Sequence, residues 1–212
     1  MKKTETQLSV NELIALHDIQ RRAIRDRLSD FGAVSSGEYF YELVYCLLTP
    51  QSSAVNAGKA VNLLKENGFR TEEINPEQLL HQEEFYIRFH RTKAKHLLRV
   101  KEQFPVIARH LSNGSSSHEL RDWLVKNVRG LGWKESSHFL RNIGHRNLAI
   151  LDRHILKNLV RAGVLRRLPK TLTPKRYLSI EKKFQNFSDQ IGIPMDELDL
   201  LFWSMETGKI LK

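Results

Sequence analysis

The chain has 212 residues, of which 41% are hydrophobic and 27% charged, and its net charge of +10 marks it as basic. No apolar run approaches the roughly 18 residues of a membrane span, and the start, MKKTETQLSV, lacks the apolar core of a signal peptide, so we expect a cytoplasmic protein. A single cysteine, Cys46, excludes an internal disulfide, a thiolate zinc site and an iron–sulfur cluster.

The spacing of apolar residues is helical nearly throughout, and no sustained alternation predicts a sheet, so we expect an all-α protein. Cys46 lies in the apolar run YELVYCLL, and we interpret it as a core residue because no nucleophile motif surrounds it. In chain order, helices are predicted at 9–28, 38–48, 52–66, 91–103, 118–127, 134–143, 153–162, 174–187 and 195–206.

Several predicted helix ends carry the residues that begin or end helices. Ser116 and Glu119 have the S-x-x-E spacing of a capping box. Gly144 and Gly163 stand where C-terminal glycines belong. Pro174 and Pro194 stand near helix starts.

Positive charge gathers in two segments. Segment 88–101 holds six Lys/Arg and no acidic residue, and segment 153–183 holds ten Lys/Arg against one acid, Glu181. Two basic zones on a mildly acidic remainder are typical of a polyanion-binding face. A generally basic surface is the alternative that charge alone leaves open.

The stretch VRGLGWK joins two predicted helices as a helix–hairpin–helix. Gly130 and Gly132 have no side chain and can adopt positive φ, so backbone N–H groups and a helix N-terminus could approach a phosphate of nucleic acid. Such a hairpin would grip the backbone without reading the base sequence. Gly-x-Gly alone is a weak signal, and a plain turn between helices is its simpler interpretation.

Eighteen residues after Lys134 stands Asp152, in LAILDRHIL. Taken singly, Lys134 would be a surface lysine and Asp152 the N-cap of the following helix. Together, the run V-R-G-L-G-W-K and the later L-D-R-H resemble the helix–hairpin–helix DNA glycosylases, the superfamily that contains endonuclease III. The resemblance implies that Lys134 is the nucleophile and Asp152 the catalytic carboxylate.

The absence of a four-cysteine cluster separates the chain from endonuclease III. The block KESSHFLRNIG, the later IPMDELDLLFWSMETGKILK and the final lysine resemble the type-2 8-oxoguanine DNA glycosylase/lyases of archaea and bacteria, from about residue 38 onward. In that family an aromatic of the last helix stacks on the expelled base and the C-terminal lysine contacts it; these positions match Trp203 and Lys212. Phe89 matches a second stacking aromatic.

Two of these residues can also be assessed from their own chemistry. Trp203 lies off the apolar face of its helix, alongside Asp196 and Asp199, so it either packs against another layer or is kept for a ligand. The carboxylate of Lys212 only accepts hydrogen bonds, so it would bond the N7–H of 8-oxoguanine and repel the N7 of guanine. A frayed end is the alternative for Lys212.

Two further matches are less specific. Gln51, in LLTPQSSA, falls where related glycosylases fill the gap left by the extruded nucleotide, although a polar residue near a helix start explains it equally well. His154 matches a phosphate-contacting position, and a partly exposed structural histidine is the alternative.

The resemblance implies base excision repair. The enzyme would flip 8-oxoguanine out of duplex DNA, displace the base with Lys134 as the free amine, and nick the strand by β-elimination. Burial and the positive end of its helix should disfavour charge on Lys134. No redox cofactor or catalytic metal is expected, although relatives allow a structural monovalent cation at the hairpin.

The same resemblance implies two helical subdomains flanking a cleft. One is residues 36–146, and the other combines 1–35 with 147–212, so that Lys134 and Asp152 would face each other. We expect a monomer that binds oxidised-guanine DNA and no membrane. A glycosylase/lyase for another oxidised base, or a non-catalytic helix–hairpin–helix DNA-binding module, are the alternatives.

Overall fold

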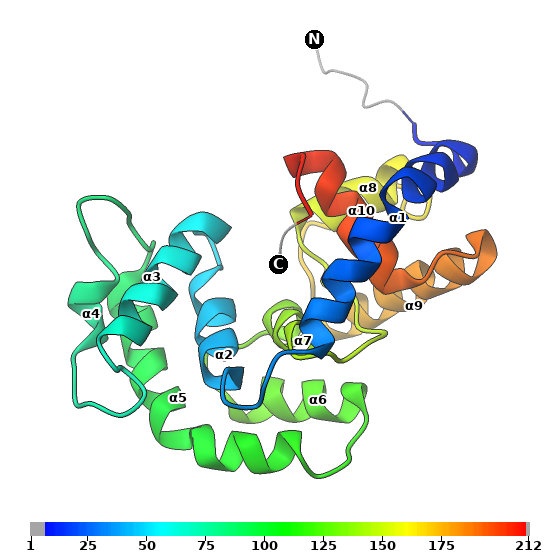
Figure 1. Cartoon of the computed structure of the whole chain (residues 1–212). Coiled ribbons are helices and arrows are strands. Elements are labelled where there is room, and N and C mark those ends of the chain that lie inside the picture. The colour runs from blue at the N-terminus through cyan, green and yellow to red at the C-terminus, as the bar shows by residue number, and fades with distance from the viewer. Residues whose placement is uncertain (1–6, 211–212) are drawn as a thin grey trace. The chain divides into compact units, whose positions relative to one another are not determined.

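The computed structural model describes residues 7–210, and within them the chain forms ten helices and no β-strand (Figure 1). The prediction of an all-α protein is therefore confirmed. The helices are α1 (Val10–Gly32), α2 (Tyr39–Leu48), α3 (Ala54–Glu66), α4 (Pro76–Leu79), α5 (His90–Leu111), α6 (Ser117–Asn127), α7 (Trp133–Asn142), α8 (Arg153–Arg161), α9 (Pro174–Ile191) and α10 (Met195–Thr207). No helix in this part of the chain is both long and apolar enough to cross a bilayer.

The chain divides into two compact units. One combines Met1–Ala33 with Gly144–Lys212, and the other is Val34–Ile143. The sequence-based division, at residues 36 and 146, falls close to these boundaries. Because the first unit uses both ends of the chain, α1 packs along α10, which also contacts α8 and α9 (Figure 1).

The contact between α1 and α10 contains a buried polar pair. His17 Nε2 lies 2.6 Å from Glu197 Oε2, and Arg25 Nε donates to Glu197 Oε1 at 3.1 Å. A buried carboxylate needs such partners, because an unpaired charge away from water is costly. These bonds fix the face that α10 presents to α1.

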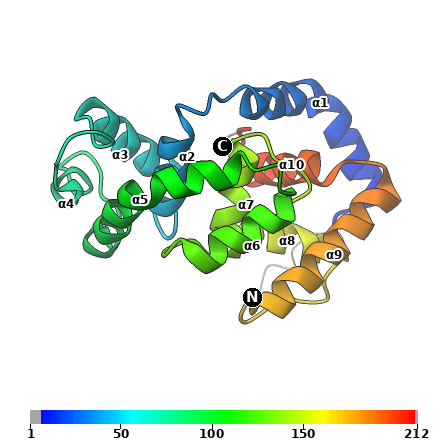
Figure 2. The same ribbon diagram turned by 90° about the horizontal axis from the view of Figure 1, so that it is seen from below.

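The second unit is organised around α2, whose residues Phe40–Leu48 are all buried. It contacts α3, α5 and α7, while α6 packs on α7 and α4 packs on α5 (Figure 2). Cys46 is fully buried within α2, which confirms its interpretation as a core residue.

The cap predictions are confirmed. Ser116 and Glu119 form the expected capping box at the start of α6. Pro174 begins α9, and Gly144 and Gly163 follow α7 and α8 with φ of 95° and 75°.

Helices α1 and α9 continue four residues past their predicted ends, to Gly32 and Ile191, and two other helices differ more. The four-residue α4 was not predicted because it is too short to show a hydrophobic period. α5 was expected to end at 103 but continues to Leu111 with Pro105 inside it. Its buried residues Phe104 and Ile107 show that packing outweighs the hydrogen bond that Pro105 cannot donate.

Candidate functional site: a glycine hairpin and a capped aspartate

The hairpin between α6 and α7 depends on Gly130. This residue has φ of +100°, and a Cβ added there would lie 2.5 Å from His96 Nδ1 and 3.1 Å from Leu47 Cδ2. Burial, and then Arg129 and Arg99, lower the pKa of His96, so the ring that packs on the hairpin is neutral at pH 7. Only glycine satisfies both the backbone angle and the space.

Gly132 differs from Gly130 in its backbone. It is the N-cap of α7 with φ of −91°, so it does not use the positive φ that is open to a glycine. Its N–H donates to Glu135 Oε2 at 3.2 Å, and the same carboxylate places Oε1 at 3.8 Å from Lys134 Nζ. Glu135 therefore closes the hairpin and stands beside the predicted nucleophile.

Lys134 lies in the first turn of α7 with its side chain 23% exposed. A second lysine of the same unit, Lys93 on α5, is buried. Burial, followed by the positive charge of Lys134, lowers the pKa of Lys93 to about 8, while Glu135 acts in the opposite direction. Lys134 and Lys93 are thus close enough for their charges to interact, with one amine partly exposed and the other buried.

Asp152 is the N-cap of α8, as predicted. Its Oδ1 accepts hydrogen bonds from the N–H groups of His154 and Ile155, both at 2.8 Å. Its Oδ2 accepts from Trp203 Nε1 at 2.9 Å. Both oxygens are therefore engaged, and three donors fix the orientation of the carboxylate.

Trp203 is half-buried and connects α10 to the start of α8. Besides its bond to Asp152, its ring lies edge-on to His154, with centroids 5.2 Å apart. Asp196 and Asp199, which the sequence placed on the same side of α10, are both buried. The helix is therefore packed on more than its apolar face, and Trp203 contacts a second layer of helices.

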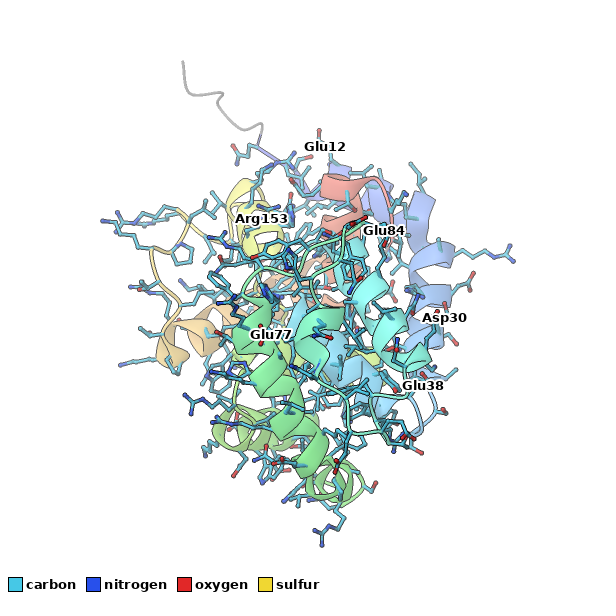
Figure 3. The ribbon with its side chains drawn as sticks, turned by 90° about the vertical axis from the view of Figure 1, so that its left-hand side faces the viewer. Glu12, Asp30, Glu38, Glu77, Glu84 and Arg153 are labelled. Carbon is cyan, nitrogen blue, oxygen red and sulfur yellow. The ribbon has the colours of Figure 1, made fainter. Side chains whose placement is uncertain are left out.

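His154 is partly exposed and has polar neighbours on both sides. Arg153, labelled in Figure 3 at the start of α8, donates from Nε to His154 Nε2 at 3.3 Å. Glu206 Oε2 lies 3.8 Å from its Nδ1 and accepts a bond from Lys157 at 2.9 Å. Although burial acts to raise the pKa of Glu206, the bonds from Lys157 and Asn158 outweigh it, and the pKa is lowered.

The extended segment that ends at Asp152 is held by two helices. Ala149 N–H donates to Glu181 Oε1 of α9 at 2.8 Å, and Tyr177 Oη donates to the Ala149 carbonyl. Asn147 N–H donates to Asp196 of α10 at 3.1 Å. These side chains satisfy backbone groups that no regular structure pairs, and they set the direction from which the chain reaches Asp152.

Gln51 and Phe89 lie in the second unit, and both have left-handed backbones, with φ of 56° and 58°. Phe89 is the N-cap of α5 and is 51% exposed. The Arg88 guanidinium carbon lies over its ring, 4.9 Å from the centroid. An exposed aromatic ring on an uncommon backbone conformation fits a surface kept for a ligand.

The structure thus groups the predicted residues by unit. Gly130, Gly132 and Lys134 share the hairpin of one unit, which also carries Gln51 and Phe89. Asp152, His154 and Trp203 are in mutual contact in the other. Lys212 lies outside the described residues.

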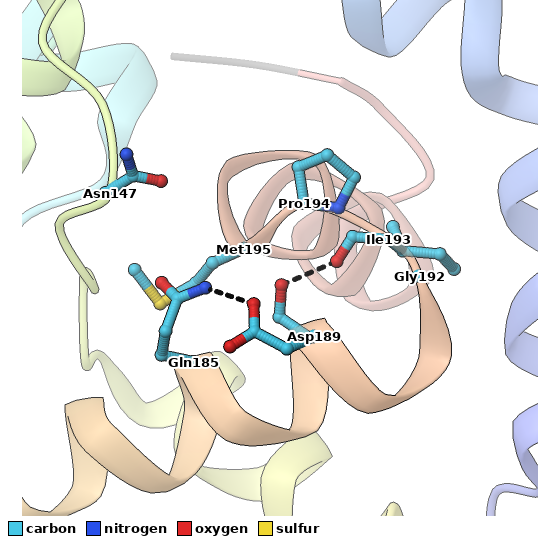
Figure 4. A pocket seen from close by; sticks show the side chains of 8 residues that line it. Asn147, Gln185, Asp189, Gly192, Ile193, Pro194 and Met195 are labelled. Atoms are coloured by element: carbon cyan, nitrogen blue, oxygen red, sulfur yellow. Dashed lines mark hydrogen bonds between the residues drawn. The ribbon is translucent and has the colours of Figure 1, made fainter.

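An open pocket of about 310 Å³ lies elsewhere in the first unit, between the end of α9 and the start of α10 (Figure 4). Gln185 Nε2 donates to Asp189 Oδ1 there at 2.8 Å, and Ser188 Oγ donates to the Ile193 carbonyl at 2.6 Å. The residues that line it include neither Asp152 nor Trp203. Within this unit, Asp152 and Trp203 thus lie outside the pocket.

Sequence reasoning missed three residues that position the site. Glu135 could have been found, because it stands three residues after Gly132 in the spacing of a capping box. Lys93 and Tyr177 could not have been found locally, since their partners are distant in sequence.

Comparison with known proteins agrees with this geometry. Residues 24–193 match the family model described as 8-oxoguanine DNA glycosylase. The 8-oxoguanine DNA glycosylase/AP lyase of Fusobacterium nucleatum is 40% identical over 224 residues, covering 100% of both chains. The protein of that name from Korarchaeum cryptofilum is 40% identical over 96% of this chain and 97% of its own.

Solved structures give the same result. The Methanocaldococcus jannaschii 8-oxoguanine glycosylase/lyase in complex with 15mer DNA containing 8-oxoguanine matches with a TM-score of 0.84 and 31% identity, over 96% of this chain and 99% of that one. The 8-oxoguanine DNA glycosylase of Thermotoga maritima matches with a TM-score of 0.80 and 27% identity, over 96% and 98%. With the glycine hairpin, the capped aspartate and an all-helical fold, these matches show that the chain belongs to the 8-oxoguanine DNA glycosylase family.

Proposed function

We propose that the protein is a bifunctional enzyme of base excision repair that removes 8-oxoguanine from duplex DNA and then cleaves the strand at the abasic site. Membership of the family supports the reaction class. The observation that carries the proposal is the Asp152 carboxylate, which three donors, one of them the indole of Trp203, hold at the start of α8.

The basic segments 88–101 and 153–183 bind the phosphates of the duplex. The damaged nucleotide rotates out of the stack, its base lies against Trp203 and Phe89, and Lys212 contacts it. Gln51 fills the gap in the duplex.

Lys134 Nζ attacks C1′ of the sugar as the free amine while the N-glycosidic bond breaks and the base leaves with the bonding electrons. The ionised Asp152 stabilises the positive charge that develops on the sugar and helps to remove the proton of Lys134. The sugar ring then opens as the C1′–O4′ bond breaks, which gives a Schiff base between Lys134 Nζ and C1′. Loss of a C2′ proton to solvent allows β-elimination, which breaks the C3′–O bond, releases the 3′ phosphate and nicks the strand.

The hairpin at Gly130 and the partly exposed His154 contact the DNA backbone, the former through backbone N–H groups. Since Glu135 already accepts from the Gly132 N–H, a phosphate at this position has to compete with that carboxylate. The protein acts as a monomer and uses no cofactor.

Borohydride trapping on duplexes that carry different lesions tests the proposal. Wild type should form a covalent adduct with 8-oxoguanine duplexes, and Lys134→Gln should form none. Lys65→Met is a matched control, because Lys65 belongs to the same unit but pairs with Glu38 at 2.7 Å, outside the basic segments. Efficient excision of thymine glycol but not of 8-oxoguanine would assign the protein another lesion, and no adduct with any lesion would leave a non-catalytic DNA-binding module.

A further inference from the structure

Lys93 is the one residue of segment 88–101 whose lysine or arginine side chain is buried. Its ammonium donates to the carbonyls of Leu48 and Pro50, both at 2.7 Å, and to Ser52 Oγ at 3.3 Å. Three donors thus meet three acceptors, which is the full bonding capacity of a lysine. One acceptor is the last residue of α2, and the other two lie in the loop between α2 and α3 that contains Gln51.

The same lysine is tied to the turn that contains Phe89. Its backbone N–H donates to the Phe89 carbonyl at 3.0 Å, which closes the first turn of α5. Ser52 Oγ also accepts from the Arg88 N–H at 3.1 Å. Ser52 and Lys93 therefore join loop 48–52 to turn 86–89 through buried and half-buried polar contacts.

A second link runs parallel to the first. Asn56 Nδ2, in the first turn of α3, donates to the Tyr86 carbonyl at 3.2 Å. Farther along the chain, Glu77 of α4 pairs with Arg91 of α5 at 3.4 Å, which adds a contact at the exposed start of α5. Of these links, the one made by Lys93 is buried, and Lys93 contacts both loop 48–52 and turn 86–89 directly.

Each of the two joined segments holds a non-glycine residue in the left-handed region, Gln51 and Phe89. This conformation is unfavourable for a residue that has a side chain, so it persists only where surrounding bonds determine it. The carbonyls that Lys93 holds are those of the residue just before Gln51 and of the helix end that precedes it. The bonds of Lys93 are therefore placed to maintain both conformations.

We propose that Lys93 is a positioning residue that clasps loop 48–52 to turn 86–89, so that Gln51 and Phe89 keep a fixed spacing. This inference rests on the proposed function, in which Gln51 fills the duplex gap and Phe89 stacks on the base. Gap filling and base stacking must occur together when a nucleotide leaves the helix. The clasp thus acts on extrusion and base recognition, and the covalent chemistry stays with Lys134.

The test compares two reactions of the full-length protein. One is release of 8-oxoguanine from a duplex in a single turnover, and the other is borohydride trapping at a preformed abasic site, where no base has to be stacked. Lys93→Met should slow base release by roughly 10- to 100-fold, as expected when reacting groups are misplaced by about 1 Å. Abasic-site trapping should fall far less, and Lys65→Met should leave both reactions unchanged.

Ser52 provides a pair of variants that keeps the test decisive if Lys93→Met does not fold. Ser52→Ala removes the oxygen that accepts from both Arg88 and Lys93. It should slow base release more than abasic-site trapping, as Lys93→Met does, but by a smaller factor. Ser52→Thr keeps the hydroxyl and should restore base release.

Equal losses in both reactions, or no loss in either, for Lys93→Met or Ser52→Ala would overturn the clasp. If Ser52→Thr were as impaired as Ser52→Ala, the shared hydroxyl would not be the cause. A wild-type protein that releases no 8-oxoguanine would instead refute the proposed function, so the two failures are distinguishable.

Discussion

Replacing Gly130 by alanine tests whether the hairpin is built as the structure indicates. A φ of +100° is one that L residues rarely adopt, and the left-handed side of the map costs about 1–2 kcal/mol. The added Cβ would also lie 2.5 Å from the ring of His96, and overpacking of this kind costs about 1–3 kcal/mol. Gly130→Ala should therefore lose about 2 to 5 kcal/mol of unfolding free energy.

Urea unfolding followed by circular dichroism measures this loss, and Gly132→Ala is the matched control in the same hairpin. Gly132 has φ of −91°, and the atom that its Cβ would meet, Glu135 Oε2 at 2.9 Å, is the end of a flexible side chain. Gly132→Ala should therefore lower the free energy of unfolding by much less than Gly130→Ala. Gly58→Ala, in α3 with open space around it, should raise stability by about 0.5–1 kcal/mol.

A double-mutant cycle with His96→Ala separates the two causes. Removing the ring should recover the overpacking part, so Gly130→Ala should cost about 1–3 kcal/mol less in the His96→Ala background. The contribution of the backbone angle should remain. If Gly130→Ala is as stable as wild type, or if the His96 background changes nothing, the assignment of glycine to this position on steric grounds is wrong.

Three other changes probe the first unit, which contains Asp152 and Trp203. Trp203→Phe keeps an aromatic ring but removes the N–H that donates to Asp152 at 2.9 Å. Single-turnover base release should therefore slow, with the activation barrier raised by up to the roughly 1.5–3 kcal/mol of a hydrogen bond to a charged group. Equilibrium titration should show that DNA binding is retained. Asp152→Asn preserves the N-cap but removes the charge, so base release should slow in the same assay with little loss of thermal stability; an unchanged rate would exclude a catalytic carboxylate. The pKa of Glu206 is lowered, so this residue stabilises the fold above its ordinary pKa of 4.5, and the stabilisation is lost as the pH falls through the pKa of the folded state. The difference in unfolding free energy between wild type and Glu206→Gln should therefore shrink on acidification. A constant difference would contradict the pairing of Glu206 with Lys157 and Asn158.

Local chemistry accounts for most of what the sequence could predict. Ser116, Asp152 and Pro174 act within three or four residues of themselves, so the helix starts that they mark can be read from the chain. The end of α5 could not be read this way, because the burial of Phe104 and Ile107 depends on other helices of its unit.

The site was predictable to the extent that its signals lie close together in sequence. The spacing of Lys134 and Asp152 led to the family, and the off-face position of Trp203 identified a residue with another role. The Trp203–Asp152 bond joins residues 51 apart, and Lys93 binds carbonyls 43 and 45 residues away. Such pairs arise from packing, which no local pattern encodes.

The contacts of α9 with segment 145–152 determine when Asp152 becomes ordered. Glu181 accepts from the Ala149 N–H, Tyr177 donates to the Ala149 carbonyl, and Trp203 donates to the Asp152 carboxylate. Asp152 is therefore oriented during folding, before DNA binds. In the catalytic role that we propose for Asp152, the cost of ordering it is then absent from the catalytic step, which is the condition for effective electrostatic stabilisation of a transition state. We therefore expect α9 to affect the activation barrier although it carries none of the proposed catalytic residues, so that damage to α9 would appear as slow chemistry at normal affinity for DNA.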